Sequence, residues 1–298
     1  MTVSFRGVIP AMVTPFKNGD LDEEALRRHV NFLLEAGVHA LLPCGTTGES
    51  PTLSHAEHKR VIEITIDEAK RRVPVLAGTG SNSTREAIEM SAHAKAAGAD
   101  GLLLVSPYYN KPTQDGLRAH FAAVARAAPL PIILYNIPGR CGVEILPETI
   151  LSLSKIPEIV GVKEATGDLN KMIRTIELCG PDFLVTSGDD GLTLPLLAVG
   201  GGGVISVAAN IIPGPMVEMW DLFEAGDLAG SRRLFFKLLP FFKALFLETN
   251  PIPIKFVMSL AGRMSAEMRL PMLEPSGPVQ ERLRALALEW KIANARAN

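Results

Sequence analysis

The stretch Gly101-Leu102-Leu103-Leu104-Val105 is a continuous apolar run, without the alternation of apolar and polar residues typical of a half-exposed strand. Continuous runs are typical of parallel strands that helices cover on both faces. Similar runs recur along the chain at the spacing of one strand–helix unit. We interpret the strands as Gly7–Phe16, Ala40–Thr47, Val73–Gly80, Gly101–Pro107, Pro131–Pro138, Ile159–Thr166, Phe183–Asp189 and Gly202–Ala208.

Segments of helical periodicity separate these runs. Ser54 with Glu57, and Ser83 with Glu86, have the spacing of capping boxes that open helices. Eight strand–helix units in succession close into a barrel more readily than they form an open sheet, so the sequence predicts a (β/α)8 barrel.

After about residue 210 the strand pattern ends. We expect a barrel in residues 1–225 and a small C-terminal helical domain in residues 226–298. The helical segments of this last part are Met216–Ala225, Leu228–Leu247, Pro253–Ala261 and Pro278–Ala295.

The composition is that of a globular protein. The chain has 298 residues, 47% hydrophobic and 21% charged, with a formal net charge of -2. This balance gives no polybasic footprint for nucleic acid or membrane partners and favours small-molecule partners. The three cysteines show no paired spacing, which fits a reducing compartment. Neither a signal peptide nor a membrane span is indicated, so we expect a cytoplasmic protein.

Catalytic residues of a (β/α)8 barrel lie at the carboxyl ends of its strands. Lys163 ends the apolar run Ile159-Val160-Gly161-Val162-Lys163. Loss of water around its ammonium group lowers the pKa, and a neutral amine can attack a keto carbon to form an imine. The alternative is a structural lysine paired with Glu164, although neighbouring strand residues point to opposite faces.

Other strand ends carry groups that suit the same chemistry. Tyr135, on the preceding strand, should lie close to Lys163 and could relay protons. Thr46 and Thr47 could hold a carboxylate. Arg140 follows a rigid turn and could bind a carboxylate in a bidentate manner, or could be an ordinary surface arginine.

Two further patterns carry less weight. The run Gly200-Gly201-Gly202-Gly203 could cradle a phosphate, but close backbone approach to a small carboxylate is preferred because no basic residue lies within it. His55 and His58 share one helix face, but no further ligands complete a metal site. We therefore expect no metal and no cofactor.

At these positions the chain resembles the dihydrodipicolinate synthase/N-acetylneuraminate lyase family over essentially its whole length. The motifs are specific only in combination. They are Gly45-Thr46-Thr47-Gly48-Glu49-Ser50, Ser106-Pro107-Tyr108-Tyr109-Asn110-Lys111-Pro112, Tyr135-Asn136-Ile137-Pro138, Gly161-Val162-Lys163-Glu164-Ala165-Thr166-Gly167, Ser187-Gly188-Asp189-Asp190 and Gly203-Val204-Ile205-Ser206-Val207.

The resemblance implies a role for each matching residue. Lys163 would form a Schiff base with pyruvate, and Tyr135 would donate and accept protons. Thr46 would link Tyr135 to Tyr109, which in the family comes from the neighbouring subunit. The resemblance also favours a homotetramer built as a dimer of dimers. The residues expected to contact substrates are Thr47, Arg140, Gly188 and Ile205.

Arg140 discriminates within the family, because sugar-acid lyases generally lack an arginine in that turn. Its presence favours condensation of pyruvate with aspartate-4-semialdehyde to 4-hydroxy-tetrahydrodipicolinate and water, in lysine and diaminopimelate biosynthesis. Allosteric inhibition by lysine is a further expectation, with Pro51 standing where small residues are more usual. The residues that match the effector cleft of lysine-sensitive members are Ser50, Pro51, His55, His58, Asn82, Glu86 and Tyr108.

Three alternatives stay open from the sequence. The nearest is a pyruvate-dependent sugar-acid aldolase of the same family, acting on N-acetylneuraminate or a 2-keto-3-deoxy acid. A catalytically silent barrel that acts as a binding module would not need Lys163, Tyr135 and Thr46 together. A phosphate-binding barrel isomerase would form no imine.

Overall fold

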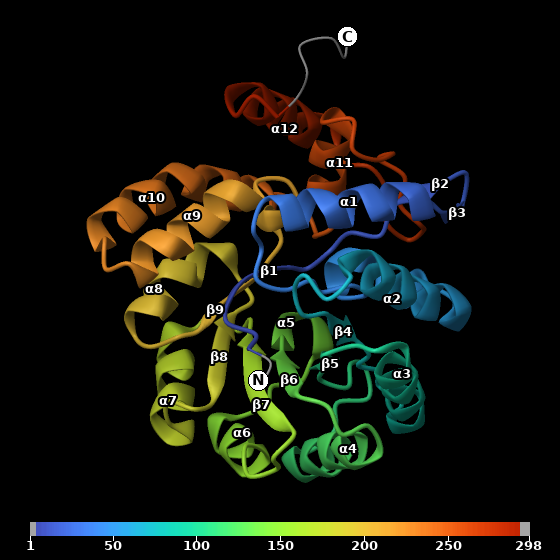
Figure 1. Ribbon diagram of the computed structural model, residues 1–298, viewed down its shortest axis with the longest axis vertical. Helices are drawn as coiled ribbons and strands as arrows, with labels where there is room; N and C mark the ends of the chain where they lie inside the picture. The colour runs from blue at the N-terminus through green and yellow to red at the C-terminus, as the bar shows by residue number, and fades with distance from the viewer. Residues whose placement is uncertain (1–3, 293–298) are drawn as a thin grey trace.

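The computed structural model describes residues 4–292. Parallel strands form a curled seven-stranded sheet in the order β1-β9-β8-β7-β6-β5-β4. Helices surround it, as Figure 1 shows, which confirms the predicted α/β barrel. The strands of the sheet are β1 (Gly7–Pro10), β4 (Leu76–Gly78), β5 (Gly101–Val105), β6 (Ile132–Asn136), β7 (Ile159–Glu164), β8 (Leu184–Ser187) and β9 (Gly203–Ser206).

The predicted strand Ala40–Thr47 is wrong. Only isolated bridges remain there, Ala11 with Leu42 and Leu41 with Val75, and these bridges join β1 to β4 and close the barrel. Proline and a left-handed residue explain the difference: Pro43 has no N–H for the ladder, and Cys44 has a φ of 57°. The other seven predicted strands are present, each shorter than predicted.

The helices follow the strands in the expected alternation. A short antiparallel pair, β2 (Phe16–Lys17) and β3 (Asp20–Leu21), precedes the first helix. The helices around the barrel are α1 (Glu23–Glu35), α2 (His55–Ala69), α3 (Thr84–Ala97), α4 (Gln114–Ala127), α5 (Pro138–Cys141), α6 (Pro147–Leu153), α7 (Leu169–Cys179), α8 (Thr193–Ala198) and α9 (Pro213–Glu224).

The C-terminal segment is helical, as predicted. Figure 1 shows α11 and α12 above α1, on the side of the molecule away from α4 and α6. Its helices are α10 (Leu228–Ala244), α11 (Ile252–Leu260) and α12 (Gly277–Glu289). The predicted helix Pro278–Ala295 therefore ends sooner than expected, and its last residues lie outside the described part of the chain.

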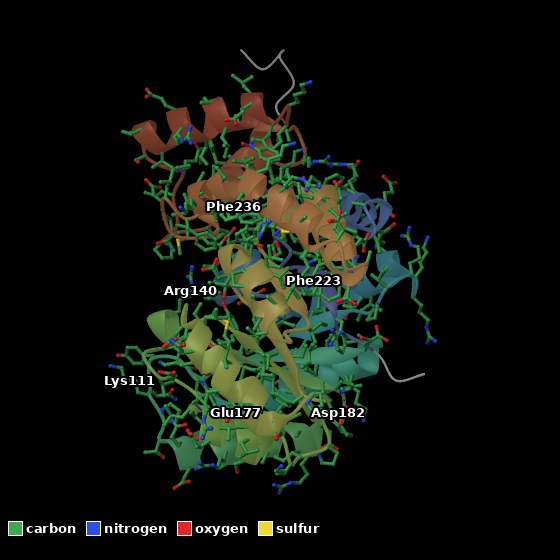
Figure 2. All side chains as sticks on the ribbon, turned by 90° about the vertical axis from the view of Figure 1, so that its left-hand side faces the viewer. Lys111, Arg140, Glu177, Asp182, Phe223 and Phe236 are labelled. Atoms are coloured by element: carbon green, nitrogen blue, oxygen red, sulfur yellow. The ribbon has the colours of Figure 1, made fainter. Side chains whose placement is uncertain are left out.

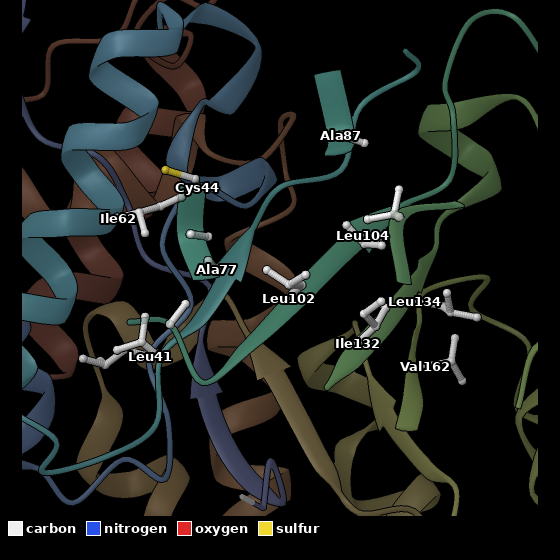
Figure 3. Packing of buried hydrophobic residues seen from close by; sticks show 14 of the residues in the cluster. Leu41, Cys44, Ile62, Ala77, Ala87, Leu102, Leu104, Ile132, Leu134 and Val162 are labelled. Carbon is white, nitrogen blue, oxygen red and sulfur yellow. The ribbon is translucent and has the colours of Figure 1, made fainter. Parts of the chain in front are cut away.

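The core shows the two-residue period of covered parallel strands. Leu102, Leu134 and Val162, labelled in Figure 3, belong to a cluster that also contains buried residues of the surrounding helices, such as Val61 and Phe121. Leu103 and Tyr135 belong instead to the cluster inside the barrel. Because side chains alternate between the faces, the residue after Val162 on β7 points into the barrel, and that residue is Lys163.

One of the two predicted capping boxes is confirmed. Ser54 caps α2, and the Glu57 side chain bonds back to the Ser54 backbone. Ser83 caps α3, but Glu86 does not complete a box there. The Glu86 carboxylate instead bonds His55 Nε2 at 2.5 Å and the Ser81 hydroxyl, and all three residues line the same cavity.

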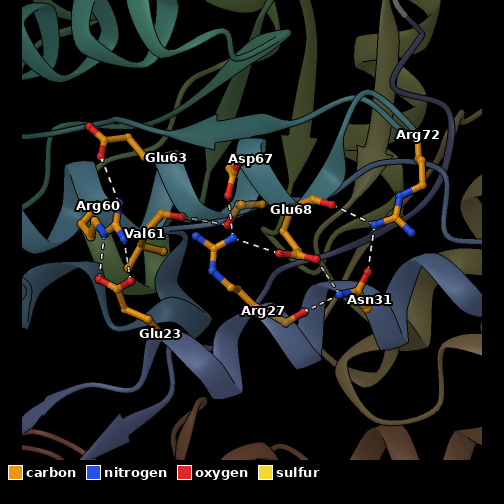
Figure 4. Close-up of polar contacts among 10 residues, drawn as sticks. Glu23, Arg27, Asn31, Arg60, Val61, Glu63, Asp67, Glu68 and Arg72 are labelled. Carbon is orange, nitrogen blue, oxygen red and sulfur yellow. Dashed lines mark hydrogen bonds and ion pairs between the residues drawn. The ribbon is translucent and has the colours of Figure 1, made fainter.

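The outer faces of α1 and α2 are joined by ion pairs, drawn in Figure 4. Arg27 donates to Asp67 at 2.6 Å and to Glu68 at 2.9 Å. These side chains are partly or largely exposed, and such pairs contribute little to stability and offer no sheltered site. Catalytic groups of a barrel are instead expected at the carboxyl ends of its strands.

Candidate active site

Lys163 is the central group of the site. It lies on β7, only 5% exposed, and its register partner on β6 is Tyr135. Burial lowers the pKa of the Lys163 amine to about 7, although the charge of Asp190 opposes that shift. A large fraction of the amine is therefore neutral near neutral pH, as a nucleophile requires.

The alternative that Lys163 is a structural lysine paired with Glu164 is wrong. Glu164 points to the outer face, where its carboxylate accepts from Asn136 Nδ2 at 3.0 Å and from the backbone N–H of Thr166 at 2.9 Å. Within residues 4–292 no carboxylate forms an ion pair with Lys163. The amine is thus buried without a direct counter-ion.

Tyr135 lies directly beside this amine. Lys163 Nζ is 4.1 Å from the centroid of the Tyr135 ring. Burial raises the pKa of the Tyr135 phenol to about 12, while its side-chain hydrogen bond with Thr46 acts in the opposite direction. A neutral phenol bonded to a second hydroxyl can pass a proton to an oxygen bound near Lys163.

Glycine is required at position 188. A Cβ atom added there would lie 3.1 Å from Lys163 Cε and 2.7 Å from Ala165 Cβ, both closer than side chains normally pack. The Gly188 N–H donates to Glu164 O at 2.7 Å, which holds the turn after β8 against β7. The missing side chain therefore leaves Lys163 room to move.

Asp190 is a site residue to which the sequence analysis gave no role. It is fully buried after β8, and its Oδ2 accepts from the backbone N–H groups of Val207 and Ala208 at 3.2 and 2.9 Å. Its Oδ1 has no partner among the described residues. Burial raises the pKa of Asp190 to about 6. Asp190 lies in the Ser187–Asp190 motif, but only the fold shows that its carboxyl group is buried near Lys163.

Asn250 is a second residue that the sequence analysis missed. Its side-chain Nδ2 donates to Thr47 Oγ1 at 3.0 Å, and its backbone carbonyl accepts from Arg140 Nη2 at 2.8 Å. Figure 2 shows Arg140 between the barrel and the C-terminal helices, which agrees with that contact. Since Thr47 accepts from Asn250, its hydroxyl proton stays free to donate to a carboxylate.

Thr46, Arg140 and Cys141 are part of the lining of a cavity of about 400 Å³. Most of the predicted effector residues line the same cavity, namely Ser50, Pro51, His55, His58, Glu86 and Tyr108. Asn82 is not part of the lining; its carbonyl accepts from Asn110 Nδ2 at 2.9 Å. His58 bonds Gly78 O at 2.7 Å.

Two further predicted site residues, Ile205 and Tyr109, differ sharply in exposure. Ile205 is buried on β9 inside the barrel, in the same cluster as Tyr135. Tyr109 is 89% exposed, with a φ of 71°, and does not line the cavity of its own chain. In the described part of the chain, no three His, Cys, Asp or Glu side chains are grouped to hold a metal ion.

The fold and the site define a class: (β/α)8-barrel enzymes that use a desolvated lysine at a strand end to form an imine with a keto acid. The chain belongs to the dihydrodipicolinate synthetase family, whose model matches residues 4–289. Both findings confirm the resemblance drawn from the motifs.

Individual members of this family are similar to the chain over nearly its whole length. The 4-hydroxy-tetrahydrodipicolinate synthase of Syntrophus aciditrophicus is 55% identical over 94% of this chain and 96% of its own. The chloride-inhibited dihydrodipicolinate synthase of Acinetobacter baumannii complexed with pyruvate is 43% identical, with a TM-score of 0.95 over 97% of this chain and 100% of its own. The Cyanidioschyzon merolae enzyme with lysine bound is 41% identical, with a TM-score of 0.94 over 97% and 99%.

Proposed function

We propose that the chain condenses pyruvate with L-aspartate-4-semialdehyde to give 4-hydroxy-tetrahydrodipicolinate and water, acting as a Schiff-base lyase in lysine and diaminopimelate biosynthesis. The observation that carries this proposal is the buried Lys163 amine beside the Tyr135 ring, with a pKa of about 7. The identity to enzymes named for this reaction supports the choice of substrates.

The reaction begins at Lys163. The neutral amine attacks the keto carbon of pyruvate, and the former keto oxygen takes one proton from the amine nitrogen and one from Tyr135 and leaves as water. The protonated imine withdraws electrons, so the methyl group can lose a proton to the Tyr135 phenolate and form an enamine. The enamine attacks the aldehyde carbon of the second substrate, and the aldehyde oxygen takes the proton from Tyr135. The amine of that substrate then displaces Lys163 and closes the ring, which frees the enzyme.

Four further residues support these reaction steps by positioning pyruvate and the proton relay, namely Thr46, Thr47, Gly188 and Ile205. Thr47 donates its hydroxyl proton to the pyruvate carboxylate, and Ile205 closes the apolar side of the pocket. Thr46 extends the relay from Tyr135 towards a second tyrosine. We assign this role to Tyr109 of a neighbouring copy, and the high exposure of Tyr109 in its own chain supports that assignment.

The same reasoning bears on assembly and location. A solvent-facing Tyr109 that belongs to an active site needs a second copy, so we propose a tight dimer, paired again into a homotetramer. Phe236 and Leu270, at 61% and 74% exposure, are apolar surface that further contacts would cover. The three free cysteines fit a cytoplasmic location. None of the helices in residues 4–292 could cross a bilayer.

Replacing Arg140 by alanine tests the second substrate. We expect kcat/KM for aspartate-4-semialdehyde to fall about 10- to 100-fold, because a charged hydrogen bond contributes about 1.5–3 kcal/mol. The KM for pyruvate should change little, since Lys163 and Thr47 bind it. Steady-state rates with each substrate varied in turn measure both effects.

The matched control is Arg118→Ala, which alters a half-buried arginine on α4 that pairs with Asp115 and bonds Thr149, outside the lining of the cavity, and should leave both constants unchanged. An unchanged kcat/KM in Arg140→Ala would remove Arg140 from the substrate site. Wild-type turnover of N-acetylneuraminate or a 2-keto-3-deoxy acid in preference to aspartate-4-semialdehyde would favour a sugar-acid aldolase instead.

We also propose that L-lysine inhibits the enzyme by binding in the cavity lined by His55 and Glu86, with Asn82 as a further contact. The pKa of Glu86 is lowered, first by its hydrogen bond with Ser81, so a carboxylate is available there for an ammonium group. We expect inhibition by L-lysine in the rate assay and a roughly tenfold loss of sensitivity in Glu86→Gln, since one charged contact is lost. Glu89→Gln, which changes an exposed residue on the same helix, is the control. Full activity at millimolar lysine would end this proposal.

A further inference from the structure

The loop from Thr46 to Thr52 leads from the threonines of the proposed pyruvate site to Ser50 and Pro51, which line the cavity of the proposed lysine site. It consists of two short 3-10 turns, η1 (Thr46–Gly48) and η2 (Ser50–Thr52). Between them Glu49 adopts a φ of 54°, a left-handed conformation that is uncommon for a residue other than glycine. The turn before Glu49 carries the threonines of the proposed relay and pyruvate site. Ser50 and Pro51 of the turn after it line the cavity, so the backbone at Glu49 connects the two proposed sites.

Glu49 is held by a lysine from the C-terminal segment. Lys255 on α11 is fully buried, and its Nζ bonds Glu49 Oε1 and donates to Thr14 O at 3.0 Å. The other oxygen, Glu49 Oε2, accepts from the backbone N–H of Arg269 at 3.1 Å. Both carboxylate oxygens are therefore paired, which a buried charge requires.

The same segment reaches the loop at further points. Asn250 bonds Thr47, as described above, and Arg269 Nη1 donates to Thr52 O at 2.9 Å. From the barrel side, Thr14 Oγ1 donates to Gly48 O at 2.7 Å. The loop is thus held from the part of the chain that we assign to the C-terminal domain, and Glu49–Lys255 is the fully buried charged contact among these.

We propose that Glu49 and Lys255 are positioning residues of the reaction: their buried ion pair fixes the Thr46–Thr52 loop so that Thr46 stays on Tyr135 and Thr47 on its carboxylate partner. A buried ion pair is a poor source of stability, because desolvation offsets much of the attraction. Its usefulness lies in the single conformation that it imposes. This inference rests on the proposed function.

The ion pair also distinguishes Lys255 from Lys163, the buried lysine of the candidate active site. Burial lowers the pKa of Lys255, as it does that of Lys163. For Lys255 the carboxylate of Glu49 opposes that shift by direct contact, whereas Lys163 has no such contact. Lys255 is therefore engaged as a fixed cation, and Lys163 is free to act as a nucleophile.

The test uses the full-length enzyme and the double variant Glu49→Gln/Lys255→Met, which removes both charges together and so leaves no unpaired buried charge. We expect cooperative thermal unfolding close to that of the wild type and a kcat lower by about tenfold or more, since small misplacements of a catalytic group have large effects. The KM for pyruvate should change less than kcat. The single variant Lys255→Met should lower both kcat and the unfolding temperature.

Lys171→Met is the control, because Lys171 pairs with Glu144 at 2.7 Å on the partly exposed outside of the barrel. Its kcat should match the wild type. A wild-type kcat in the double variant, or a loss no greater than its unfolded fraction, would overturn the inference. The wild type is assayed and trapped with pyruvate and borohydride beside the variants, so that the two proposals can fail separately. A wild type without condensation activity would count against the proposed function. A wild-type kcat in every variant would count against the positioning role.

Discussion

Replacing Lys163 by methionine is expected to lower kcat by at least about three orders of magnitude and to abolish the covalent adduct with pyruvate. Methionine fills a similar apolar volume, so the barrel should fold, but no other group in the site can form the imine. The measurement is borohydride reduction in the presence of pyruvate, followed by mass mapping of the modified peptide.

Lys255 provides an internal control in the wild type. It is as buried as Lys163, but its ammonium group is occupied by Glu49 and Thr14, so the reduced adduct should map to Lys163 and not to Lys255. An adduct on Lys255, or the absence of any adduct in the wild type, would contradict the assignment of the nucleophile.

The sequence predicted the barrel because its parallel strands are covered on both faces and therefore read as apolar runs. β5 is such a run and is present from Gly101 to Val105. The predicted strand at Ala40–Thr47 failed where local chemistry prevailed over hydrophobicity. Pro43 can accept from Gly78 N–H at 3.0 Å but cannot donate, so the ladder stops.

The placement of Lys163 and Tyr135 could also be predicted, because strand order and the two-residue period bring them together. The detailed roles of Thr46, Tyr109 and Arg140 came from the family resemblance, since spacing alone left their alternatives open. Membership of the family supports those roles, and the experiments proposed for each residue are their test.

The residues that support the site could not be predicted. Asn250 and Thr47 are 203 positions apart, and Lys255 and Glu49 are 206 apart. No local pattern relates such pairs. The residues next to a lysine in an apolar segment do not indicate whether it is a nucleophile or half of an ion pair. The difference is the position of one carboxylate, which only the tertiary structure provides.

Replacing Tyr135 by phenylalanine should lower kcat about 100-fold or more, in the range typical of general acid–base groups, because the phenol that donates a proton during imine formation is lost. The ring itself remains beside Lys163, so packing and the KM for pyruvate should change little. Steady-state rates and the time course of borohydride trapping measure the two effects separately: the adduct should still form on Lys163, but slowly.

Tyr108→Phe is the matched control, since Tyr108 lines the cavity of the proposed lysine site and takes no part in the proposed relay. Its kcat without effector should equal that of the wild type. If Tyr135→Phe keeps a wild-type kcat, then the proton reaches the substrate oxygen by another route. The hydrogen bond between Thr46 and Tyr135 would in that case hold the ring in place without carrying protons.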